Sequence, residues 1–154
     1  MKFSKLFFSL IICFAVAGAG SAVTLNAIST WYAILNKPIF NPPNTIFGPV
    51  WTLLYLLMSI SLAIVWSQKK KTISALQMFF AQLGLNFLWS YVFFGLHLPF
   101  GGLIVIILLW AAIFQTIKRF SPISKYAAYL LYPYLAWVSF AAILNLAIVI
   151  LNFQ

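Results

Sequence analysis

Amide and aromatic side chains that can bind another molecule recur at helical spacing in this sequence. Four of them are separated by four, three and four positions, which places them on one face of a helix: Gln82, Asn86, Trp89 and Phe93. An amide can orient a carbonyl or carboxylate group, and an indole ring offers a flat surface for stacking. This face is therefore a candidate wall of a binding site for a flat, mostly apolar molecule.

Two further stretches carry similar faces. Trp51 and Tyr55 lie one helical turn apart, and a later stretch has the same kind of spacing at Tyr134, Trp137, Ala141 and Asn145. Several such faces converging in a small bundle predict an apolar cavity with a few polar contacts, the usual form of a small-molecule site. Taken singly, the amides are better explained as hydrogen-bonding partners between helices.

The composition excludes most carboxylate chemistry. The 154 residues include nine Lys and Arg, one His and no Asp or Glu. An acid–base pair of carboxylates and a carboxylate-held calcium or magnesium site are therefore impossible. One His and one Cys cannot supply three or four zinc ligands. We expect neither a metal site nor an obligatory cofactor.

The elements that must position these side chains are predicted to be transmembrane helices. The chain is 65% hydrophobic and only 6% charged, whereas a soluble domain is about one quarter charged. Five uncharged stretches approach or exceed the roughly 20 residues that cross a bilayer as a helix, at about 6–25, 46–66, 73–94, 98–117 and 126–151. They lack the alternation of a β-barrel. We expect an all-α membrane protein, with residues 1–154 forming one five-helix bundle.

Positive charges predict the orientation of this bundle. With five spans, eight of the nine cations fall on one side and only Lys37 on the other. The positive-inside rule then places the N-terminus in the cytoplasm and the C-terminus outside, most simply in a bacterial inner membrane. Because the charges are dispersed over short connections, contact with anionic lipid explains them better than nucleic-acid binding. The eight are Lys2, Lys5, Lys69, Lys70, Lys71, Lys118, Arg119 and Lys125.

The first span has an alternative interpretation as a cleavable signal peptide. Its Lys-containing start and apolar run are followed by small residues, as at a cleavage site. Small residues such as Gly18 and Ala22 equally permit close packing of a helix that stays in the protein. Cys13 is alone, so no disulfide within the chain is possible, and inert packing is expected for it.

The connection between the first two spans is predicted to contain a short helix. Ser29 or Thr30 can cap a helix that starts at Trp31. Pro38 disfavours helical geometry at Lys37, so this helix should end there.

The same connection is too apolar for an ordinary solvated loop. Pro42 and Pro43 force an extended piece, after which Asn44 or Thr45 can cap the second span. Its side chains fit equally an aromatic belt at the membrane surface or a lid folded over the helix ends. The residues assigned to this lid are Trp31, Leu35, Lys37, Pro38, Pro42 and Pro43.

Two prolines and the histidine predict local features of the spans. Pro49 is tolerated in the first turn of the second span, and Pro133 frees the carbonyl of Tyr129 and allows a kink in the fifth. His97 is expected as a turn residue near the membrane surface rather than as a haem ligand.

Four blocks of sequence carry a resemblance to a known family. They follow one another over about residues 30–150: Trp31 to Pro43, Phe47 to Tyr55, Gln82 to His97, and Pro133 to Asn145. In order and content these blocks resemble the TspO/MBR family, also called tryptophan-rich sensory proteins, translocator proteins or peripheral-type benzodiazepine receptors.

The resemblance implies both a fold and a function. The family fold is a five-helix transmembrane bundle, often dimeric, whose first long loop closes a pocket, so the resemblance favours the lid. Family members bind porphyrins such as protoporphyrin IX and haem, and synthetic isoquinoline carboxamide or benzodiazepine ligands; some also bind cholesterol. The implied role is a membrane receptor or sensor that binds tetrapyrroles and similar flat apolar ligands.

The resemblance also implies residue roles. Tyr32 and Trp137 match an aromatic pair linked to light-dependent porphyrin breakdown in some bacterial members, which makes them the candidate catalytic residues. Lys37 either attracts porphyrin propionates or anchors the loop at the membrane surface. With Trp89 and Tyr134 added from the helical faces, the predicted ligand-binding residues are Tyr32, Trp51, Tyr55, Asn86, Trp89, Tyr134, Trp137 and Ala141.

The sequence departs from the family pattern in two places. The end of the fifth span, from Asn145 to Gln154, lacks the Tyr and the Lys or Arg of the cholesterol motif. The fourth span, from Leu103 to Trp110, lacks the acidic residue of many members. Sterol recognition by that motif is therefore not expected, and a role of such an acid in gating does not carry over.

Three alternatives to simple binding remain open from the sequence: light- and oxygen-dependent porphyrin degradation, transport of a porphyrin or lipid, and a scaffold for partner proteins. Transport ranks below binding because no charged relay or inverted repeat is visible.

Overall fold

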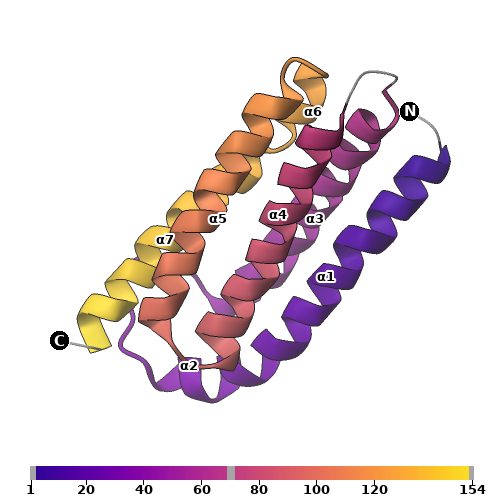
Figure 1. The fold of residues 1–154 in the computed structure, drawn as a ribbon. Coiled ribbons are helices and arrows are strands. Elements are labelled where there is room, and N and C mark those ends of the chain that lie inside the picture. Colours follow the sequence, from indigo (N-terminus) through magenta and orange to yellow (C-terminus); the bar gives the residue numbers. More distant parts are fainter. Residues whose placement is uncertain (1–2, 69–71, 153–154) are drawn as a thin grey trace.

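Five long helical segments form the protein, shown by a computed structural model that describes residues 3–68 and 72–152 (Figure 1). Lys2 and Lys69 to Lys71, which contribute to the predicted orientation, lie outside the described residues, as do Phe153 and Gln154. The elements are α1 (Phe3–Ser29), α2 (Trp31–Ile34), α3 (Asn44–Trp66), α4 (Ile73–Ser90), the π-helix η1 (Tyr91–Gly95), α5 (Pro99–Phe120), α6 (Lys125–Tyr129) and α7 (Tyr132–Asn152).

The long helices run side by side and form one bundle (Figure 1). α1 packs against α3 and, less extensively, against α4 and η1, while α5 packs between α4 and α7. We call the end that carries α2 and the last residues of α7 the loop end. The opposite end, with the start of α1, the end of α5 and α6, is the basic end, because it carries Lys5, Lys118, Arg119 and Lys125.

The predicted fold class is confirmed. Five helical segments are long and apolar enough to cross a membrane, and the described residues contain no strand. The segments extend beyond the predicted bounds because charged and polar residues continue the helices. Lys5 lies inside α1 with its ammonium 4.1 Å from the ring centre of Trp66, and Lys118 and Arg119 form the last turn of α5. Cations at a helix C-terminus are favoured by the helix dipole.

The fifth segment is interrupted near Pro133, as predicted. α6 ends at Tyr129 and α7 starts at Tyr132, with a two-residue turn between them. A proline lacks the N–H that would bond to the carbonyl four residues earlier, so the helical ladder is weakened at this point.

The predicted helix caps in the first connection are wrong. The hydroxyls of Ser29 and Thr30 donate to the carbonyl of Asn26, at 3.2 and 2.7 Å, instead of accepting from α2. Ser29 still belongs to α1, and a hydroxyl at a helix end readily bonds back to a carbonyl three or four residues earlier. α2 also ends at Ile34, three residues before Lys37.

The start of the second span differs in a similar way. α3 begins at Asn44 directly after Pro43, so Asn44 and Thr45 are helical residues and provide no side-chain cap. The extended backbone of Pro43 (φ −55°, ψ 142°) leads straight into the helix. Pro49 consequently lies in the second turn, not the first.

Candidate functional site

Two cavities lie in the half of the bundle nearest the loop end. The larger, about 540 Å³, lies between α1, α3, α4 and η1, and the smaller, about 30 Å³, lies between α2, α3, α4, η1 and α7. Four aromatic residues line both: Phe47, Trp51, Trp89 and Phe94. The cavities are therefore neighbours that share an aromatic wall.

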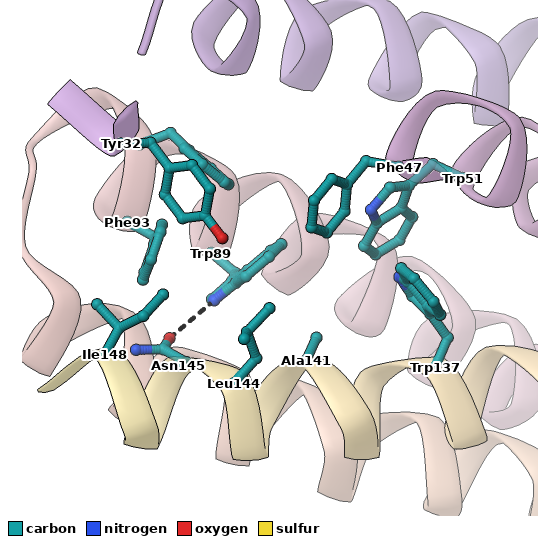
Figure 2. A pocket seen from close by; sticks show the side chains of 11 residues that line it. Tyr32, Phe47, Trp51, Trp89, Phe93, Trp137, Ala141, Leu144, Asn145 and Ile148 are labelled. Carbon is teal, nitrogen blue, oxygen red and sulfur yellow. Dashed lines mark hydrogen bonds between the residues drawn. The ribbon is translucent and has the colours of Figure 1, made fainter. Parts of the chain in front are cut away.

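The smaller pocket brings together residues from distant parts of the sequence (Figure 2). Tyr32 enters from α2, Trp51 from α3 and Trp89 from α4, and the facing side is a strip of α7. Its volume suffices for about one or two water molecules. A larger ligand would need the aromatic side chains to move. The α7 residues are Trp137, Ala141, Leu144, Asn145 and Ile148.

Trp51 is the centre of the shared aromatic wall. Its ring centroid lies 5.9 Å from that of Tyr55, 6.2 Å from that of Trp89 and 6.3 Å from that of Tyr134. Trp51 is half-buried, so one part of its indole supports the core and another faces the cavities. Such a wall offers flat stacking surface to an aromatic ligand.

A buried hydrogen-bond relay joins three helices behind this wall. The hydroxyl of Tyr55 donates to Oδ1 of Asn86 at 2.7 Å, and Nδ2 of Asn86 donates to the hydroxyl of Tyr134 at 2.7 Å. Tyr134 is fully buried and lines neither cavity. Tyr134, a predicted ligand-binding residue, therefore lies behind the cavity wall, where it holds Asn86 in place.

Asn86 keeps free hydrogen-bonding capacity despite this relay. A side-chain amide has two N–H donors and an oxygen with two lone pairs, and the relay uses one of each. Asn86 also lines the larger cavity. It can therefore meet a polar group of a ligand while Tyr55 and Tyr134 hold its orientation.

Asn145 provides a second link between helices. Its Oδ1 accepts from Nε1 of Trp89 at 3.2 Å, and its Nδ2 donates to the carbonyl of Pro99 at 2.8 Å. Asn86 and Asn145 thus bond across helices, while Gln82, equally buried, has no hydrogen-bond partner for its amide among the described residues. The amides of the predicted helical faces are buried, as expected, but they differ in role.

Trp137 has an unused donor. Its Nε1 is buried without a hydrogen-bond partner among the described residues, and its ring lies 6.2 Å from that of Phe47. Trp137 and Ala141 both line the smaller pocket (Figure 2). An acceptor atom of a ligand placed there would satisfy this indole.

Tyr32 connects the loop to the pocket. The side chain is only 2% exposed, and its hydroxyl donates to Oδ1 of Asn41 at 2.8 Å. Burial raises the pKa of Tyr32 to about 12, so the phenol stays neutral well above physiological pH. The ammonium of Lys37 lies 5.1 Å from the Tyr32 ring centre and donates to the carbonyls of Ala33 and Leu35.

The rest of the loop is held against the helix ends. Trp31 stacks on His97 with ring centroids 4.6 Å apart, and Leu35 packs against the core. Asn36 is bonded through its backbone to the side chain of Asn152. His97 is exposed in the turn after η1, with a left-handed φ of 55°, and the segment around Pro38, Pro42 and Pro43 is non-helical. That this segment opens and closes as a lid stays a prediction.

Several lining residues were absent from the predicted site. Leu144 lies three positions after Ala141 and Ile148 four positions after Leu144, so both continue the α7 face and periodicity alone could have found them. Phe47 and Phe94 also lie within the blocks of sequence that carry the family resemblance. The contribution of α1 to the larger cavity, including Gly18 and Ser21, had no signal beyond small side chains.

The described residues contain no group of three or more His, Cys, Asp or Glu that could hold a metal ion. What they do present is an aromatic cavity with a few neutral polar groups, in a bundle of membrane-spanning length.

Comparison with known sequences assigns this protein to a family. The pattern of the TspO/MBR family matches residues 9–151, almost the whole chain. The chain belongs to the TspO/MBR family.

Individual relatives agree with this assignment. The chain is 48% identical to the tryptophan-rich protein TspO of Archaeoglobus fulgidus over 153 residues, 99% of each chain. It is 44% identical to the protein of the same name from Chlorobaculum tepidum, over 92% of this chain and 91% of that one. The human translocator protein is 38% identical over 75% of this chain and 70% of its own. This TspO/MBR protein is an integral membrane protein with five spanning helices.

Proposed function

We propose that this TspO/MBR protein is a membrane receptor that binds a tetrapyrrole, such as protoporphyrin IX or haem, or a similar flat apolar molecule. The observation that carries the proposal is the cavity of about 540 Å³ walled by Trp51, Tyr55, Asn86 and Trp89. This volume falls in the range of small-molecule sites, about 300–1,000 Å³. Four of the predicted ligand-binding residues line this cavity.

The chemistry of the walls supports a flat ligand with a few acceptor groups. Trp51 and Trp89 supply stacking surface, and Asn86 has a free N–H that can orient a carbonyl or carboxylate. The described wall residues include no charged side chain, so selectivity rests on aromatic faces, amides and backbone groups. Tyr32, Trp137 and Ala141 extend the site into the smaller pocket once the aromatic rings rearrange.

Titration with protoporphyrin IX, followed by its fluorescence, tests the binding proposal. Trp51→Ala removes the central stacking surface and is expected to weaken binding about ten-fold. Trp66→Ala is the matched control, because Trp66 lies at the basic end and lines neither cavity. The assignment of the site would be contradicted if both variants bound protoporphyrin IX equally weakly, or if both bound it as tightly as the wild-type protein.

A second candidate function is oxidation of the bound porphyrin by dioxygen in light. The observation that favours it is that Tyr32 and Trp137, from α2 and α7, line the same pocket. Illumination of the complex in air, followed at the porphyrin absorption band, tests it. Slower bleaching in Trp137→Phe than in Phe140→Leu would support a role for the Trp137 ring; equal bleaching would exclude it.

The basic end is proposed to face the cytoplasm of a bacterial cell, with the loop end outside. This orientation is supported by the positive charges at the two ends: the basic end carries Lys5, Lys118, Arg119 and Lys125, and the loop end carries Lys37. In a Cys13→Ser background, a membrane-impermeant maleimide should label Asn36→Cys in intact cells and leave Ser121→Cys unlabelled. The reverse pattern would invert the orientation.

We also propose that the protein is a homodimer, as the family resemblance implies. Cross-linking in native membranes at low expression should give a band of twice the monomer mass.

A further inference from the structure

The larger cavity extends from the surface of the bundle to its core. Its inner wall consists of Tyr55, Asn86 and Trp89, which are all buried. Its outer rim includes exposed residues along two helices, Gly18, Ser21 and Leu25 on α1 and Asn44, Thr45, Gly48 and Thr52 on α3. The cavity therefore has an open side at the surface where α1 and α3 lie next to each other.

On its opposite flank, α1 contacts α4 and η1. A Cβ atom added to Gly20 would lie 3.6 Å from Oγ of Ser90 on α4. A Cβ atom added to Gly95 at the end of η1 would lie only 2.9 Å from Cγ1 of Val23 on α1. These contacts join α1 to α4 and η1 at two levels on this side of the cavity.

Empty space marks the open flank. A Cβ atom added to Gly18 or to Gly48 would meet no atom within 4 Å. The hydroxyl of Thr52 donates to the carbonyl of Gly48 at 2.9 Å, so it is satisfied within its own helix. The side chains of the rim at these positions are thus small, and a ligand that passes them breaks no hydrogen bond between helices.

The environment of this opening is the membrane. The rim residues lie within the two membrane-spanning helices α1 and α3, in the halves nearest the loop end. Exposed side chains at this depth face lipid chains or the lipid–water interface, because the helices themselves cross the bilayer. A molecule dissolved in this leaflet therefore has the opening beside it.

The smaller pocket is tightly covered at the loop end. Tyr32 is almost fully buried over the smaller pocket, and Trp31 stacks on His97. Asn36 and Asn152 hold the following segment to the end of α7 through two hydrogen bonds. A ligand that entered the smaller pocket from water at this end would have to separate these contacts.

We infer that lipid-dissolved flat ligands reach the cavity sideways, from the membrane leaflet at the loop end, through the opening between α1 and α3. The inference depends on the binding function proposed above and adds the route and the source of the ligand. Gly18 and Gly48 are the residues that keep this route open.

Stopped-flow binding in proteoliposomes tests the route, with protoporphyrin IX delivered from donor vesicles. Gly48→Leu and Gly18→Leu place a larger side chain in the empty space. A narrower passage slows movement in both directions, so the association and dissociation rate constants are expected to fall together, by about ten-fold, while Kd changes much less. A change in the dissociation rate alone would instead show that these residues only line the site.

Two control variants sharpen the result. Gly84→Leu adds the same side chain at an exposed glycine of α4 that also has no atom within 4 Å but lines neither cavity, and it should keep wild-type rates. Asn152→Ala loosens the loop and should also leave both rates unchanged. If a Leu variant is misfolded, so that it does not elute as a single species in size-exclusion chromatography, Gly48→Val provides a smaller obstruction.

The outcomes separate the route from the function. If wild-type protein binds protoporphyrin IX but Gly48→Leu has wild-type rates, or Asn152→Ala accelerates both rates, the lateral route is wrong and the binding function stands. If wild-type protein shows no saturable binding, the binding function itself fails, and the route fails with it.

Discussion

The side chain of Asn152 forms two hydrogen bonds with the backbone of Asn36, 116 positions earlier in the chain. Its Oδ1 accepts from the Asn36 N–H at 2.8 Å, and its Nδ2 donates to the Asn36 carbonyl at 2.9 Å. One amide at the end of α7 therefore satisfies both backbone groups of a residue just after α2. This pair fastens the first connection to the last helix.

Asn152→Ala is expected to release this connection. Both bonds are exposed, so the loss of stability should be about 1 kcal/mol or less, and the main effect should be local. Hydrogen exchange of the Asn36 amide should become faster, while amides in the middle of α7 keep their protection. Asn36→Ala is the matched control: it keeps the backbone groups that form the pair, so it should retain slow exchange at position 36.

Asn86→Leu is expected to be strongly destabilising. It removes the centre of the relay and leaves the buried hydroxyls of Tyr55 and Tyr134 without their observed partner, at a cost of about 1–3 kcal/mol for each group left unsatisfied. Thermal unfolding in detergent should show a lower midpoint. The triple variant Asn86→Leu, Tyr55→Phe, Tyr134→Phe should recover part of the loss, and no recovery would argue against the relay.

Gln82→Met is expected to leave stability unchanged or to increase it. Gln82 is one helical turn from Asn86 and equally buried, but neither atom of its amide has a hydrogen-bond partner among the described residues. Replacing an unpaired buried amide by an apolar side chain of similar size removes a desolvation cost. A clear fall in the unfolding midpoint would show that the Gln82 amide is paired in the membrane.

The buried phenol of Tyr32 predicts a pH dependence. Its folded-state pKa is about 12, above the value near 10 of an unfolded tyrosine. Its contribution to stability is therefore fully present below about pH 10 and is lost as the pH rises toward 12. Between pH 8 and 11, wild-type protein should lose more stability than Tyr32→Phe, because the other tyrosines are common to both. Parallel losses would contradict a buried neutral phenol.

Hydropathy and charge were sufficient to predict the bundle. Uncharged stretches of spanning length gave all five helical segments, and helical spacing correctly grouped Gln82, Asn86, Trp89 and Phe93 on one buried face. The residues at the ends were harder to assign. Ser29 was predicted to cap α2 but remains in α1, because a hydroxyl near a helix end can bond either forward or back to its own helix.

The candidate site, too, could be predicted only in part from the sequence. Tyr134 and Trp137 share a helical face, yet only Trp137 lines a cavity, while Tyr134 is enclosed by the relay with Asn86. Spacing along a helix gives the direction of a side chain but not what lies opposite it at that depth. The open flank at Gly18 and Gly48 is equally invisible in the sequence, because empty space belongs to the positions of two helices relative to each other.

The sequence by itself determined that this is a membrane protein with five spans, which family it belongs to and which helical faces turn inward. These properties depend on composition and on periodicity within single segments. Only the tertiary structure decided which inward residues support the site and which line it, that Asn152 holds the loop, and where the cavity opens. Those properties arise from contacts between segments far apart in the chain, and they depend on how neighbouring helices pack at each level of the bundle.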